Sequence, residues 1–176
     1  MRDETNLEKL TQFMIDLAGR VRGEARIYLT GGATALLEGW RTMTIDIDLK
    51  ADPEPRGFFE AIALLKETNN INVELASPDD FIPELPGWRE RCLFIKRHKQ
   101  LDYFHYDPYS QALSKLERAH ARDLLDVSQM ADRGLIQPER LWELFESIAP
   151  RLIRFPAIEP ASFRASVQAF CEQSKP

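Results

Sequence analysis

The stretch Tyr28–Leu49, YLTGGATALLEGWRTMTIDIDL, carries the pattern that decides the fold. An apolar run leads into a double glycine at Gly31 and Gly32, and a short helix-like segment follows. A second apolar run then contains Asp46 and Asp48. This order predicts a strand, a glycine turn, a short helix and a second strand.

The two aspartates of the second run are two residues apart, so in a strand their side chains share one face. The residues that alternate with them are expected to enter a core: Ile45, Ile47 and Leu49. Two carboxylates held side by side repel each other, and a divalent cation removes that cost. Because Mg²⁺ prefers carboxylate oxygens, we predict that Asp46 and Asp48 bind Mg²⁺ or Mn²⁺.

The double glycine suits a phosphate group, because a helix that follows it offers free N–H groups at the positive end of its dipole. The alternative is a tight turn with positive φ and no ligand. The chain contains neither G-x-x-x-x-G-K-[ST] nor G-x-G-x-x-G, which excludes a P-loop and a dinucleotide-binding fingerprint. With the acidic pair close by in the sequence, the glycines predict nucleotide chemistry.

The order of Gly-Gly, a helix and Asp-x-Asp resembles the DNA polymerase β-like nucleotidyltransferase superfamily. A finer pattern is similar to the AbiEii-type and minimal nucleotidyltransferase branch of bacterial toxin–antitoxin systems: Arg41-x-x-Thr44-x-Asp46-x-Asp48-Leu49. A second block is similar to the helical segment that follows the catalytic sheet in those proteins: Lys115, Leu116, Arg118, Arg122, Asp123 and Asp126. The resemblance covers about Arg26 to Met130.

The resemblance implies an α+β fold, with a mixed sheet flanked by helices in residues 1–107 and a helical extension in residues 108–176. It implies a metal-dependent nucleotidyltransferase that moves a nucleoside monophosphate from an NTP onto a hydroxyl. The acceptor would be an RNA such as tRNA, a protein or a small molecule, and a cognate toxin–antitoxin partner is expected. The alternative is an inactive domain of this fold that binds a partner or senses a nucleotide.

The superfamily adds a third carboxylate on a later strand. Asp102, in the predicted strand 100–106, is the first choice, and Glu74, in the predicted strand 71–75, is the rival. We therefore predict Asp46, Asp48 and Asp102 as the catalytic and metal-binding residues.

Several further residues are predicted to contact the nucleotide. The resemblance implies that Lys115 reaches the triphosphate and that Arg122 braces the site, whereas the alternative is a helix held by salt bridges. Arg41 and Thr44 either position the nucleotide or cap a loop, and the sequence is compatible with both. The full predicted nucleotide-binding set is Thr30, Gly31, Gly32, Arg41, Thr44, Lys115 and Arg122.

The rest of the sequence predicts a hairpin rich in basic residues and several helices. Residues 88–96 and 100–106 are expected to form two strands of a hairpin, rich in Arg and Lys, that is either a solvated face or a nucleic-acid contact. Residues 109–133 are expected to form one long helix or two. Helices are also expected over residues 5–21, 139–147 and 160–172.

The totals of the sequence limit the class of protein. A formal charge of −5 does not predict a general attraction to nucleic acid. Two distant cysteines, Cys92 and Cys171, are typical of reduced thiols. No apolar run is long enough to span a bilayer and the first residues are polar, so we expect a cytoplasmic protein with no membrane partner.

Overall fold

The computed structural model describes residues 3–174, which fold into two compact units. The first unit extends to Ser77 and resumes at Cys92–Tyr106, and the second comprises Pro78–Arg91 together with the chain from Asp107 onward. Residues 78–91, which the sequence prediction includes in the segment 1–107, therefore belong to the second unit.

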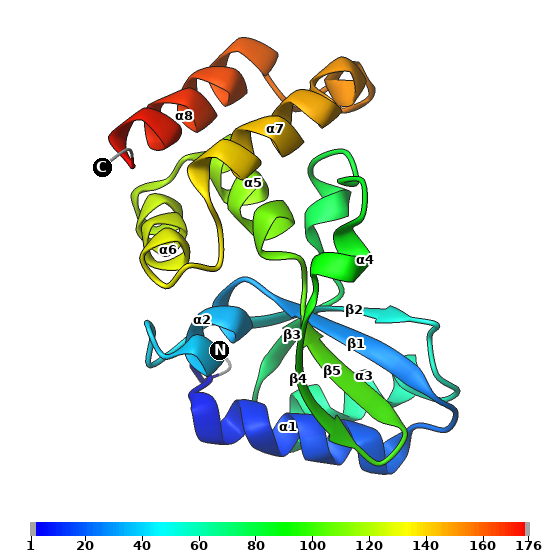
Figure 1. The fold of residues 1–176 in the computed structure, drawn as a ribbon. Coiled ribbons are helices and arrows are strands. Elements are labelled where there is room, and N and C mark those ends of the chain that lie inside the picture. The colour runs from blue at the N-terminus through cyan, green and yellow to red at the C-terminus, as the bar shows by residue number, and fades with distance from the viewer. Residues whose placement is uncertain (1–2, 175–176) are drawn as a thin grey trace. The chain divides into compact units, whose positions relative to one another are not determined.

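A five-stranded mixed sheet forms the centre of the first unit, in the strand order β3-β2-β1-β5-β4 (Figure 1). β1 is antiparallel to β2 and parallel to β5, β2 is parallel to β3, and β4 is antiparallel to β5. The mixed sheet with its helices confirms the predicted α+β class. The strands are β1 (Ala25–Thr30), β2 (Asp46–Asp52), β3 (Asn72–Glu74), β4 (Leu93–His98) and β5 (Leu101–His105).

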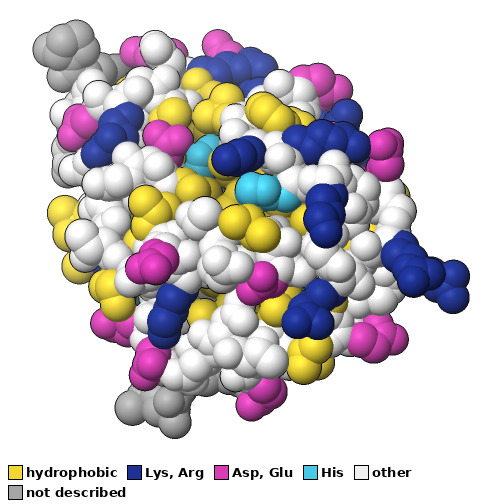
Figure 2. Space-filling model, turned by 90° about the horizontal axis from the view of Figure 1, so that it is seen from below, with side chains coloured by type: hydrophobic (Ala, Val, Ile, Leu, Met, Phe, Trp, Pro, Cys, Tyr) yellow, Lys and Arg dark blue, Asp and Glu magenta, His cyan; other side chains and the backbone are white. Residues whose placement is uncertain are grey.

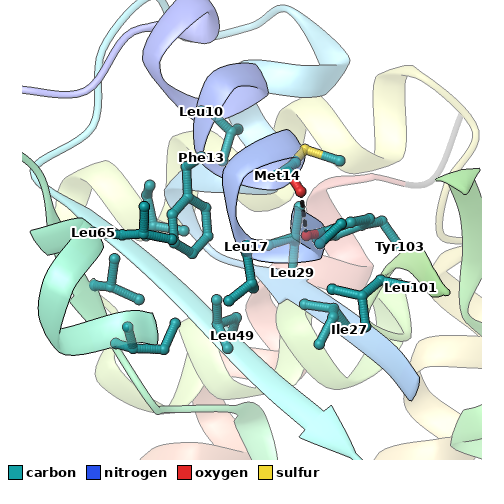
Figure 3. Packing of buried hydrophobic residues seen from close by; sticks show 14 of the residues in the cluster. Leu10, Phe13, Met14, Leu17, Ile27, Leu29, Leu49, Leu65, Leu101 and Tyr103 are labelled. Atoms are coloured by element: carbon teal, nitrogen blue, oxygen red, sulfur yellow. Dashed lines mark hydrogen bonds between the residues drawn. The ribbon is translucent and has the colours of Figure 1, made fainter. Parts of the chain in front are cut away.

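One face of this sheet is covered by α1 (Leu7–Arg20) and α3 (Phe58–Thr68), as Figure 1 shows. The side chain of Asn6 caps α1 by accepting a hydrogen bond from the backbone N–H of Lys9. Apolar residues at three- and four-residue spacing on α1 meet alternate residues of the strands (Figure 3), and each buried side chain contributes roughly 1.5–3 kcal/mol. This core includes Leu10, Phe13, Leu17, Ile27, Leu29, Ile47, Leu49 and Leu65.

A buried hydroxyl joins the first helix to the sheet. The hydroxyl of Tyr103 donates to the backbone oxygen of Met14 at 2.7 Å, as Figure 3 shows. The polar atom of this large side chain is thereby satisfied inside the core.

The second strand is predicted over residues 45–50, and β2 begins one residue later, at Asp46. Ile45 is 60% exposed, so the prediction that it enters the core is wrong. The chain just before β2 is held by Thr5 instead, because Thr5 and Thr44 exchange two backbone hydrogen bonds of 2.7 and 2.9 Å. Ile47 and Leu49 are fully buried, as predicted.

The predicted strand 88–96 is wrong in its first half. Trp88–Arg91 form a short helix, α4, and only the residues from Leu93 belong to a strand. The hairpin itself is confirmed, because β4 pairs with β5 across a turn at Lys99 and Gln100.

The second unit is helical. Residues 109–133 form two helices rather than one, because Ala119 adopts the left-handed conformation between them. The elements of the second unit are η1 (Pro78–Asp80), α4 (Trp88–Arg91), α5 (Pro108–Arg118), α6 (Ala121–Asp132), α7 (Pro138–Ile148), η2 (Ala149–Arg154) and α8 (Pro160–Gln173). None of the helices within residues 3–174 is both long and apolar enough to cross a membrane.

Candidate active site

The glycine turn lies directly against the acidic strand. β1 ends at Thr30, which pairs with Asp48 of β2, and Gly31 follows with φ 62° and ψ −128°. A Cβ atom added to Gly31 would lie 3.0 Å from Oδ2 of Asp48. The structure therefore brings together the two features that the sequence separates, the glycines and the Asp-x-Asp pair.

The second glycine is required by packing. Gly32 begins α2 (Gly32–Glu38), and a Cβ atom added to it would lie 1.9 Å from Oγ1 and 2.6 Å from Cβ of Thr44. Thr44 is fixed in turn by its pairing with Thr5 and by a 3.1 Å hydrogen bond from its hydroxyl to the backbone oxygen of Asp46. A substitution at Gly32 therefore disturbs the start of β2 as well as the turn.

Asp46 and Asp48 share the sheet face opposite the α1/α3 core, and both are half-buried. They are joined there by residues of β3, because Asp46 pairs with Asn72 and Asp48 pairs with Glu74 in parallel register. Paired residues on neighbouring strands lie about 4.8 Å apart and point to the same side. Asn72 donates its side-chain amide to Oδ1 of Asp46, and Glu74 is exposed.

The other predicted third carboxylate, Asp102, is not brought to this pair. It pairs with Arg26, four residues along β1 from Thr30, a separation of about 13 Å along the strand. Arg97 holds it with hydrogen bonds of 3.1 Å to both carboxylate oxygens. Within residues 3–174, no cluster of three or more His, Cys, Asp or Glu side chains is already arranged to hold a metal ion.

Thr30 precedes the glycine turn, and Arg41 follows the helix α2 that begins there. Thr30 is buried at the end of β1, next to Gly31. Arg41 follows the end of α2, is half-buried, and its backbone N–H donates to the oxygen of Ala35 at 3.3 Å. The predicted contacts of Thr30 and Arg41 with a nucleotide stay predictions.

A buried histidine links α2 to the sheet near this site. His105 pairs with Leu29 at the end of β5. Its Nδ1 atom lies 3.1 Å from Oγ1 of Thr34, and its Nε2 atom lies 3.1 Å from Oε1 of Glu38. Burial lowers the pKa of His105 to about 4. A neutral ring satisfies both contacts if Nε2–H donates to Glu38 and Nδ1 accepts from the hydroxyl of Thr34.

Thr34 and Glu38 are not among the residues that the sequence analysis selects. Their i, i+4 spacing on one short helix is the only signal of a shared partner, and nothing local in the sequence identifies His105 as that partner.

Lys115 and Arg122 lie in the helical unit. The ammonium group of Lys115 is buried and lies 2.7 Å from Oδ2 of Asp126 and 3.6 Å from Oδ1 of Asp123. Arg118 also binds Asp123, at 2.8 Å, and Arg122 is exposed on α6. These contacts match the alternative of helices held by salt bridges, and a contact of Lys115 or Arg122 with triphosphate stays a prediction.

The predicted basic cluster is divided between the two units. Arg91 of α4 donates to both carboxylate oxygens of Asp107, at 3.1 and 2.7 Å. In the hairpin, Arg97 is paired with Asp102 and Glu24. Figure 2 shows one face of the molecule, on which Lys and Arg side chains are separated by acidic, hydrophobic and uncharged surface.

Comparison with known proteins identifies a family for the chain. Residues 5–160 match the model of a family described as nucleotidyltransferase of unknown function (DUF6036). No curated protein and no solved structure matches the chain. The match supports the predicted nucleotidyltransferase superfamily but does not single out the AbiEii or minimal nucleotidyltransferase branch. Since the matched segment spans most of the sequence, the chain belongs to this family of nucleotidyltransferases of unknown function.

Proposed function

We propose that the protein is a metal-dependent nucleotidyltransferase whose carboxylates are Asp46, Asp48 and Glu74. The observation that carries the proposal is the contact of the glycine turn with Asp48, on a sheet face where Glu74 stands beside it. A polyphosphate lying against the turn would bring its negative charge next to the acidic residues. Because like charges repel, this arrangement is stable only with cations between the phosphates and the carboxylates.

The residues fit a magnesium ion by their chemistry. All three candidate ligands are carboxylates, the oxygen donors that Mg²⁺ prefers, and they come from two hydrogen-bonded strands. The amide of Asn72 occupies one oxygen of Asp46 and orients that carboxylate. When bound, the metal would neutralise charge on the phosphates and lower the pKa of the acceptor hydroxyl.

The chain's own groups have separate roles in the proposed reaction. The backbone at Gly31 permits the triphosphate to approach Asp48 closely, because no side chain fills that space. The acceptor oxygen would form a bond to the α-phosphorus while the bond to pyrophosphate breaks. Glu74, the exposed carboxylate of the three, would take the acceptor's proton.

The third carboxylate is assigned to Glu74 rather than Asp102 because of strand order. β3 adjoins β2, so Glu74 stands beside Asp48, whereas Asp102 lies at the far end of the sheet and is held by Arg97. The toxin–antitoxin association and the cytoplasmic location remain predictions from the resemblance and the composition.

A transfer assay tests the proposal. The protein is incubated with Mg²⁺ and each of the four NTPs labelled at the α-phosphate, with total RNA or its own polypeptide as acceptor. Label transfer that is lost in Asp46→Asn and kept in Asp102→Asn supports the proposal. Metal-dependent NTP binding without transfer to any acceptor would instead identify a nucleotide sensor.

A further inference from the structure

A row of contacting aromatic rings crosses the sheet. The ring of Phe94 on β4 meets that of Phe104 on β5 at a centroid distance of 5.5 Å, in an edge-to-face arrangement. Phe104 meets Tyr28 on β1 at 5.7 Å. These residues are paired in the strand register, so the three rings share one face of the sheet.

That face is the one that carries the proposed catalytic carboxylates. Tyr28 lies two residues before Thr30 on β1, and Thr30 pairs with Asp48. Residues two apart on a strand point to the same side, as do paired residues on neighbouring strands. The aromatic row therefore leads from the acidic site towards the edge strand β4.

Two planar groups that contact Phe104 are exposed to solvent. Phe94 is 60% exposed, and the guanidinium of Arg26, also exposed, lies over the ring of Phe104 at 5.5 Å. Phe104 is half-buried and anchors both. We refer to Phe94, Phe104 and Arg26 as the platform.

The chemistry of the platform fits a base and its phosphate. Single-stranded nucleic acid is bound by exposed aromatic rings on which bases stack, together with cations that track the backbone. Arg26 can stack on a base or pair with a phosphate, and Lys50 lies on the same face because it pairs with Tyr28. With a net charge of −5, the chain does not attract nucleic acid as a whole, so binding depends on local groups of this kind.

We propose that the platform binds a single-stranded nucleic acid, and that this strand is the nucleotide acceptor; its role as acceptor rests on the proposed function. Phe94 on β4 is three strand spacings from Asp48 on β2, and Tyr28 in the same row is two residues along β1 from Thr30, the partner of Asp48. These spacings place Phe94 about 16 Å from Asp48. At about 3.4 Å per stacked nucleotide, this distance corresponds to about five nucleotides from the reacting hydroxyl.

The test measures binding of a short, unstructured, fluorescently labelled RNA to the full chain by anisotropy, without NTP and with EDTA. Phe94→Ala is expected to weaken binding about tenfold, the loss of one base–aromatic stack. Arg26→Gln is expected to weaken binding and to reduce the slope of log affinity against log salt by about 0.7, the effect of one phosphate contact. DNA of the same sequence shows whether the sugar matters.

Matched controls come from the opposite side of the sheet. Phe59 on α3 is 54% exposed, and Arg20 at the end of α1 is exposed as well. Phe59→Ala and Arg20→Gln should bind the RNA as the wild type does. Phe94→Trp should retain binding, and its fluorescence should be quenched when RNA is added, because the stacking surface is preserved.

The outcomes separate this proposal from the proposed function. Absence of RNA binding by the wild type, or equal binding by Phe94→Ala and the wild type, overturns the platform even if NTP binding persists. A change of oligomeric state in Phe94→Ala with unchanged RNA affinity also overturns it and identifies a protein interface. RNA binding that depends on Phe94 in a chain that binds no NTP supports the platform as a nucleic-acid site while overturning the transferase proposal.

Discussion

Asp48 and Glu74 occupy paired positions on the adjacent parallel strands β2 and β3. This pairing predicts that Glu74→Gln abolishes Mg²⁺-dependent transfer, because the proposed third carboxylate is lost. Asp102→Asn should retain activity, since Asp102 pairs with Arg26 at the other end of the sheet. Initial rates of label transfer with both variants decide between the two carboxylates, and activity in Glu74→Gln with none in Asp102→Asn would reverse the assignment.

The close approach of Gly32 to Thr44 predicts a folding defect. Gly32→Ala should lower the free energy of unfolding by about 1–3 kcal/mol, because the new methyl group overlaps Thr44. Thr44→Gly removes the overlapping atoms, so Gly32→Ala should cost less in that background. Urea unfolding of the two single variants and the double variant measures this coupling. Additive effects would mean that the contact does not constrain position 32.

The buried ion pair of the helical unit gives a prediction about Lys115. Lys115→Met leaves the buried carboxylate of Asp126 without its cation, so the free energy of unfolding should fall by about 3–5 kcal/mol. Lys115→Met with Asp126→Leu should regain much of that loss. If Lys115→Met instead has the same free energy of unfolding as the wild type but binds NTP more weakly, the lysine binds the triphosphate, as the resemblance implies.

His105 predicts a pH dependence of stability. Its folded pKa of about 4 lies below the ordinary value of 6.5, so folding favours the neutral ring. The resulting stabilisation, about 3 kcal/mol, is complete above pH 6.5 and is lost as the pH falls towards 4.

His105→Gln is the reference, because it isolates the contribution of the imidazole to the pH dependence from that of the rest of the chain. The difference in unfolding free energy between the wild type and this variant should shrink as the pH falls from 7 to 4. A difference that does not change with pH would contradict a buried neutral imidazole.

Local patterns in the sequence are sufficient to predict the strand and the turn that carry the proposed site. The alternation of Ile47 and Leu49 with the aspartates predicted β2, and the double glycine predicted the turn, because both signals are contained in a few neighbouring residues. Ile45 continued the same alternation but lies outside the strand, since the pairing of Thr44 with Thr5 is a long-range contact that no local pattern shows.

The choice between the two predicted third carboxylates depends on tertiary structure. Asp102 and Glu74 both lie on strands among apolar neighbours, and only the strand order places one of them beside Asp48. The helix at Trp88–Arg91 was missed for a related reason. Its apolar and basic residues fit a strand equally well, and Arg91 is fixed by Asp107, sixteen residues further along the chain.

We propose above all that the carboxylates beside the glycine turn bind a metal–nucleotide complex. Isothermal titration of a non-hydrolysable NTP analogue with Mg²⁺ tests it most directly, using the wild type, Asp48→Asn and, as a control on the same strand, Asp52→Asn. We predict binding that requires Mg²⁺, is lost in Asp48→Asn and is unchanged in Asp52→Asn. Binding that is equal in Asp48→Asn and the wild type, or that persists without a divalent cation, would contradict the claim.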